Sequence, residues 1–134
     1  MGLITDCKCI FCDDPCETRE HLFIKCPVAE QLWNVVFSHS GLHFTVHSWD
    51  ALIAWACSTW KGKSLLTSIM KLGFTALIYI LWDERNKPLF QGRFRNSQDL
   101  FHAIKDIVRL QLRDRNINRN DNVNITLVEH WDIY

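Results

Sequence analysis

Four candidate metal ligands near the start of the chain constrain its fold more than any other feature. They follow the pattern Cys9-x2-Cys12-x8-His21-x4-Cys26 in a chain of 134 residues. Two cysteines separated by two residues can direct both sulfurs at one ion about 2.3 Å away, and a histidine and a further cysteine can complete a tetrahedron. Three thiolates and one imidazole make a closed Zn²⁺ site with no open position for water. The pattern therefore predicts a structural zinc knuckle rather than a catalytic zinc.

Two further cysteines leave alternatives open. Cys7 forms only a tight pair with Cys9, and Cys16 could replace Cys12 at the loss of the two-residue spacing. Five of the six cysteines lie within the first 26 residues, whereas a secreted disulfide framework spreads its cysteines along the chain. No secretory signal pattern leads the chain. The clustering therefore favours metal binding in a reducing compartment, so we expect an intracellular protein, nuclear or cytoplasmic.

Helical periodicity dominates the rest of the chain, and hydrophobic residues make up 48% of it, too many for a disordered protein. We predict a mainly α fold in one compact domain: a zinc knuckle over residues 1–26, a body of about four helices over residues 27–116, and an extended tail over residues 117–134. The tail is expected to be extended because residues 122–128 alternate like a strand.

Local signals give the expected helix ends. Thr18 is a plausible N-cap for a short helix that carries His21, and Ser48 and Ser97 are expected to cap later helices. Helices are expected over residues 27–39, from Ser48 onward, over 64–86 and over 97–115, with Gly41 suited to the first stop. The most apolar stretch, residues 65–82, contains a central lysine, so we interpret it as a buried amphipathic helix rather than a membrane span.

The formal net charge of zero is the sum of one basic and two acidic segments. Residues 59–120 carry twelve Lys or Arg against five Asp or Glu, a net +7, whereas residues 1–58 carry −4 and residues 121–134 carry −3. Such asymmetry indicates a charged partner, here RNA or single-stranded DNA. We predict that the contacts to nucleic acid come from seven cations of this segment: Arg85, Lys87, Arg93, Arg95, Lys105, Arg109 and Arg113.

The last three of these cations recur every fourth residue, which places them in one helical stripe. Phe90 and Phe94 lie among the other cations, and aromatic rings beside cations can stack bases and hold a phosphate backbone. The alternative is a solvated helix face on which Asp106 and Asp114 pair locally with the cations.

No pattern in the chain indicates catalysis, and we predict that the protein is not an enzyme. The carboxylates form no recognisable catalytic pair, and the five glycines form no phosphate-binding loop. Cys57 is expected to be a buried helix residue rather than a nucleophile. The tryptophans at positions 33, 49, 55, 60 and 82 lie in apolar helical patterns, so we expect them in the core.

Several motifs together resemble a known family. Cys9-Ile10-Phe11-Cys12, residues 17–23 (ETREHLF), Cys26-Pro27-Val28-Ala29 and Trp33 are similar to the reverse transcriptase zinc-binding domain. That domain lies near the C-terminus of plant LINE-type (non-LTR) retroelement polyproteins. The later segment 81–86 (LWDERN) with Phe90 resembles the part of the domain that follows its finger, so the resemblance covers about residues 7–115.

The resemblance implies that Cys9, Cys12, His21 and Cys26 are the CCHC ligands and that the module associates with nucleic acid during reverse transcription. The chain carries no Tyr/Phe-x-Asp-Asp polymerase signature and no RNase H carboxylate set. We therefore expect a detached fragment or domesticated remnant without the parent's activity. The alternative is a protein-interaction or vestigial module with a purely structural zinc, which could self-associate through exposed aromatic residues.

Overall fold

The computed structural model describes residues 9, 11–12, 18–86 and 96–133, and this part of the chain is helical without strands. The sequence-based prediction of a mainly α fold with the cysteine cluster at its N-terminal end is confirmed. A short π-helix, η1, precedes five α-helices among these residues. Their bounds are η1 (His21–Lys25), α1 (Pro27–His39), α2 (Trp49–Thr59), α3 (Leu65–Asn86), α4 (Ser97–Leu112) and α5 (Asn122–Trp131).

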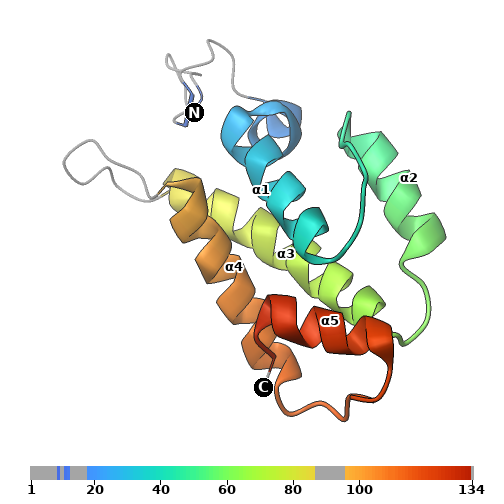
Figure 1. The fold of residues 1–134 in the computed structure, drawn as a ribbon. Coiled ribbons are helices and arrows are strands. Elements are labelled where there is room, and N and C mark those ends of the chain that lie inside the picture. The colour runs from blue at the N-terminus through green and yellow to red at the C-terminus, as the bar shows by residue number, and fades with distance from the viewer. Residues whose placement is uncertain (1–8, 10, 13–17, 87–95, 134) are drawn as a thin grey trace.

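Helix α3 forms the centre of the bundle. It packs most extensively against α4, and also against α1, α5 and η1. In Figure 1, α1 and α3 lie between α4 on one side and α2 on the other, and α5 crosses one end. By length and composition alone α3 could cross a membrane, as core helices of soluble proteins also could. In this fold it is an amphipathic core helix, as its sequence predicts, with residues such as Ile69, Leu77 and Leu81 fully buried.

Most helix ends follow from local chemistry. Pro27 opens α1, and Gly41, just after its end, takes a φ of +71°, which glycine adopts without strain. Ser48 caps α2 by accepting a hydrogen bond from the Ala51 N–H at 3.0 Å. Helix α4 differs slightly from the prediction. Asn96 rather than its neighbour caps it, since the Asn96 side chain accepts from a first-turn N–H, and the helix ends three residues early, at Leu112.

The predicted extended tail is wrong, because residues 122–131 form α5. Alternating apolar residues suggested a strand, but Val123 and Ile125 are exposed. The buried residues of this segment recur at helical spacing instead, and they are Leu127, Val128 and Trp131. Asp121 starts the helix by accepting a hydrogen bond from the Asn124 N–H at 3.1 Å. The tail therefore adds a fifth α-helix to the four that we predicted.

His39, in the last turn of α1, lies where α4 and α5 meet. Its ring is 4.6 Å from the Phe101 ring, and its Nδ1 donates a hydrogen bond to the Val35 carbonyl at 3.1 Å. Burial lowers the pKa of His39, the hydrogen bond to Val35 opposes this change, and the positive charge of Lys105 lowers the pKa further. The folded protein therefore favours the neutral imidazole.

The charged side chains of Lys105 and Asp132 beside His39 pair with each other. Asp132, the C-cap of α5, forms an ion pair with Lys105 at 2.8 Å, and that hydrogen-bonded lysine lowers the pKa of the Asp132 carboxyl. Asp132 also raises the pKa of His39, but this contribution is smaller than that of burial.

We predict that the free energy of unfolding falls as the pH drops below about 6.5, the pKa of an unfolded histidine. Since the His39 pKa is lowered in the folded state, the unfolded chain binds that proton first, and stability rises with pH. One proton limits the effect to about 1.4 kcal/mol per pH unit, and the partial exposure of His39 reduces it further.

The check is urea unfolding at neutral pH and at about pH 5.5. His39→Gln should have a shallower pH dependence than the wild type. His47→Gln, a change of an exposed residue, should keep the wild-type dependence. Equal slopes for the three proteins would contradict the prediction.

Candidate metal centre

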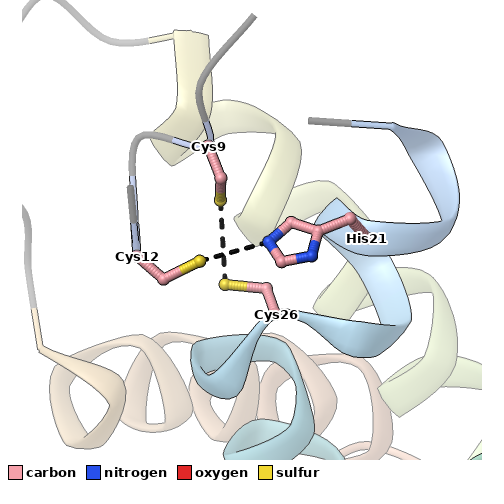
Figure 2. Close-up of side chains that lie close together, drawn as sticks. All are labelled: Cys9, Cys12, His21 and Cys26. Atoms are coloured by element: carbon pink, nitrogen blue, oxygen red, sulfur yellow. Dashed lines mark hydrogen bonds between the residues drawn. The ribbon is translucent and has the colours of Figure 1, made fainter. Parts of the chain in front are cut away.

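The four predicted ligands converge on one point at the N-terminal end of the bundle. Figure 2 shows Cys9 and Cys12 reaching from the loop before η1, His21 from the first turn of η1, and Cys26 from its junction with α1. Their ligand atoms all lie within 4.8 Å of one another. The Sγ atoms of Cys9 and Cys26 are 3.8 Å apart, and Cys12 Sγ lies 3.2 Å from His21 Nε2.

These distances fit the edges of a metal-centred tetrahedron. Zn–S and Zn–N bonds of usual length give edges of about 3.8 Å between two sulfurs and about 3.5 Å between sulfur and nitrogen. The sulfur–sulfur distance matches, and the sulfur–nitrogen distance is shorter by a few tenths of an ångström. The Cys3His group could therefore hold a metal ion with small side-chain adjustments.

The π-helical turn explains how His21 and Cys26 meet. The Cys26 N–H donates to the His21 carbonyl at 2.7 Å, a bond across five residues. In an α-helix, two residues five apart point about 140° away from each other. The wider π turn places the side chains of His21 and Cys26 on the same side of the helix. Thr18 starts this turn as predicted, since its hydroxyl accepts from the His21 N–H at 3.0 Å.

Two of the sulfurs are shielded from water. Cys9 and Cys26 have no exposed surface, and burial raises the pKa of both thiols, that of Cys26 to about 12. Cys26 is also the N-cap of α1, and the backbone N–H groups of Val28 and Ala29 partly offset the effect of burial. A divalent cation would supply the positive charge that buried thiolates need.

The cluster is tied to the bundle by two long-range hydrogen bonds. The buried Trp33 indole N–H donates to the Phe23 carbonyl at 2.7 Å, which links α1 to η1. The Glu20 carboxylate accepts the Trp49 N–H with its two oxygens at 3.0 and 3.1 Å. Because Trp49 is the first residue of α2, the residue beside a metal ligand completes the cap of a distant helix. Sequence reasoning missed this role of Glu20, since no local spacing links it to α2.

Of the predicted nucleic-acid residues that the structure describes, two cations on α4 form ion pairs. Lys105 pairs with Asp132, which lies 27 residues further along the chain. Arg109 pairs with Asp106 at 3.2 Å, a local pair that the solvated-face alternative anticipates. Arg113 is exposed at the C-cap of α4. Arg85 lies in the last turn of α3. The other predicted contacts, Lys87, Arg93 and Arg95, lie outside the described residues, as do the interleaved Phe90 and Phe94.

The predictions for the remaining cysteines and for the tryptophans are confirmed only in part. Cys57 is exposed on α2, so the prediction of a buried residue is wrong. Cys7 and Cys16, the alternative ligands, lie outside the described residues. Trp33 is in the core as predicted, whereas Trp82 is 52% exposed, so the prediction of a core position for Trp82 is wrong.

No protein-family model, no curated protein and no solved structure matches the chain. The candidate metal centre is therefore defined by its own geometry.

We predict that Glu20→Ala lowers the free energy of unfolding by about 1–2 kcal/mol, because α2 loses a charged acceptor at its N-terminus. Backbone amide exchange should accelerate in α2 more than in α3 or α4. Glu129→Ala removes an exposed glutamate side chain from α5 and should leave both measurements unchanged. Uniform acceleration of exchange in all helices, or none, would contradict the role of Glu20.

Proposed function

We propose that this chain is a zinc-binding, non-catalytic module that associates with nucleic acid. The observation that carries the proposal is the convergence of Cys9, Cys12, His21 and Cys26 within 4.8 Å. Thiolate and imidazole ligands in tetrahedral geometry suit zinc better than the hard cations calcium and magnesium. Four protein ligands leave no open position for a reacting water, so the zinc would stabilise the fold rather than catalyse a reaction.

Charge supports the nucleic-acid part of the proposal. Residues 59–120 carry a net +7, and several of their cations are exposed, among them Lys63, Arg113 and Arg115. Cations on a surface bind phosphate backbones of either nucleic acid by releasing counterions. Lys105 and Arg109 contribute less to such binding because carboxylates already neutralise them.

The resemblance to the reverse transcriptase zinc-binding domain supports the same proposal. The four ligands keep the order of its CCHC motif, and the segment 81–86 follows in the order that the resemblance requires. We accordingly propose an intracellular, retroelement-derived module whose partner is RNA or single-stranded DNA.

A second candidate function is protein interaction with a purely structural zinc. Two observations favour it: the stripe on α4 is partly neutralised, and Tyr79 and Trp82 expose large aromatic surfaces on α3. Exposed apolar patches on soluble domains often mark protein contacts. Binding measurements with nucleic acid separate the two candidates.

We predict that the purified protein contains about one zinc per chain and that removing the metal unfolds the N-terminal segment. Elemental analysis gives the stoichiometry, and Co²⁺ substitution should give the absorption of a tetrahedral thiolate site. Cys26→Ser should lose the metal and much of the stability, whereas Cys57→Ser, a change on the exposed surface of α2, should keep both. Full folding in a strong chelator would contradict a structural metal.

We predict that the zinc-loaded protein binds single-stranded RNA or DNA more weakly as salt rises. Fluorescence anisotropy over a salt series measures this dependence. Arg113→Gln should reduce the slope of log K against log salt by about 0.7, the value for one phosphate contact with a single strand.

The neighbouring Asp114→Asn provides the matched control, since it removes an exposed charge of opposite sign and should strengthen binding. Absence of binding at low salt would overturn the nucleic-acid proposal and favour the protein-interaction candidate.

A further inference from the structure

A polar pocket lies where the start of α3, the end of α4 and the start of α5 meet, at the end of the bundle that α5 crosses (Figure 1). Its volume is about 370 Å³, within the range of roughly 300–1,000 Å³ that small-molecule sites span. The apolar residues that line it, Leu65, Leu112 and Ile117, are buried or half-buried and form its floor. The polar residues around them are more exposed and form a rim of cations, hydroxyls, amides and one carboxylate.

Two cations meet at the α3 side of this pocket. Lys63 directly precedes Ser64, the residue whose hydroxyl caps α3, and Ser68 is one helical turn further on the same face. The Arg115 guanidinium donates a hydrogen bond to the Ser68 hydroxyl at 3.4 Å, which brings the residue after α4 against the first turn of α3. In the part of the chain that the structure describes, no carboxylate forms an ion pair with Lys63 or Arg115, unlike the two paired cations of α4.

The first turn of α3 adds to the positive character of this side. Helix α3 has 22 residues, and the N–H groups at the N-terminus of a helix carry partial positive charge that favours an anion. The Ser68 hydroxyl accepts from Arg115, so its own proton is available to an acceptor on a ligand. An ammonium, a guanidinium and a hydroxyl beside a helix N-terminus together suit a phosphate group, whose oxygens accept several charged hydrogen bonds.

Amides and a carboxylate form the α5 side of the pocket. The Asn124 side-chain amide donates to the Asn118 carbonyl at 3.1 Å, and the Asp121 carboxylate accepts from the Asn124 N–H at 3.1 Å. Among the described residues, neither Nδ2 of Asn118 nor Oδ1 of Asn124 has a hydrogen-bond partner. One amide donor and one amide acceptor are therefore available to a ligand.

This distribution of charge selects among ligands. Inorganic phosphate would lie near the Asp121 carboxylate as well as the cations, and it would leave the apolar floor uncovered. A nucleotide carries a phosphate at one end and neutral hydrogen-bonding groups at the other, so a carboxylate can accept from its sugar hydroxyls. An acidic peptide offers an anion on a flexible stem but no flat ring for an apolar floor.

We propose that the pocket binds one nucleotide, with its phosphate between Lys63 and Arg115 and its sugar and base over the apolar floor toward Asn118 and Asn124. The proposal deepens the proposed association with nucleic acid and rests on it, because a single strand supplies such a unit, as does a free nucleoside monophosphate. Neither cation belongs to the seven that the sequence predicts, because only the fold brings the start of α3 and the end of α4 together.

Titration with adenosine 5′-monophosphate, followed by amide NMR shifts of the metal-loaded full chain, tests the pocket itself. Saturable shifts should gather at residues 63–68 and 115–124. Inorganic phosphate alone and adenosine alone should each bind at least about tenfold more weakly, because each lacks one half of the contacts. Absence of saturable shifts, shifts that gather elsewhere, or inorganic phosphate that binds as tightly as the nucleotide overturns the proposal.

Charge-removing variants test the phosphate contacts. Lys63→Gln and Arg115→Gln should each raise the dissociation constant of the monophosphate by about fivefold or more, because each removes one charge beside the phosphate. Both side chains are exposed, and circular dichroism confirms that each variant folds. Lys71→Gln is the matched control, since it removes an exposed lysine of α3 outside this pocket and should leave the affinity unchanged. Wild-type affinity in both pocket variants overturns the proposal.

A single-stranded oligonucleotide separates this proposal from the proposed function. The strand should bind more weakly to both pocket variants, and adenosine monophosphate should compete with it. A strand that binds the variants like the wild type and that the monophosphate does not displace overturns the pocket and leaves the proposed function standing. A protein that binds the monophosphate in the pocket but binds no strand at low salt overturns the proposed function and assigns the pocket to free nucleotides.

Discussion

Cys26 joins the candidate metal centre to the helical bundle. Its side chain faces the other three candidate ligands, its N–H closes the π turn onto the His21 carbonyl, and its residue is the N-cap of α1. A cation at this sulfur would stabilise the loop, the turn and the first turn of α1 together. The buried side chains of η1 then have a fixed position from which to enter the core.

Short-range chemistry explains what could be predicted from the sequence. The ligand set spans few residues, so spacing alone identified it, and Pro27, Gly41 and Ser48 mark helix ends through their own backbone preferences. The prediction for the tail failed because its apolar residues fit both the period of a strand and the period of a helix. Contacts with α1, α3 and α4 select the helix that buries Trp131, and these contacts are invisible in the local pattern.

The parts of the site that sequence reasoning missed depend on long-range contacts. Glu20 meets Trp49, and Lys105 meets Asp132, in each case across more than twenty residues. The second contact bears on the proposed binding of nucleic acid, since it neutralises a cation that spacing alone had assigned to that role. The exposure of Trp82 was equally hidden, because the sequence pattern of α3 does not show which of its apolar side chains a neighbouring element covers.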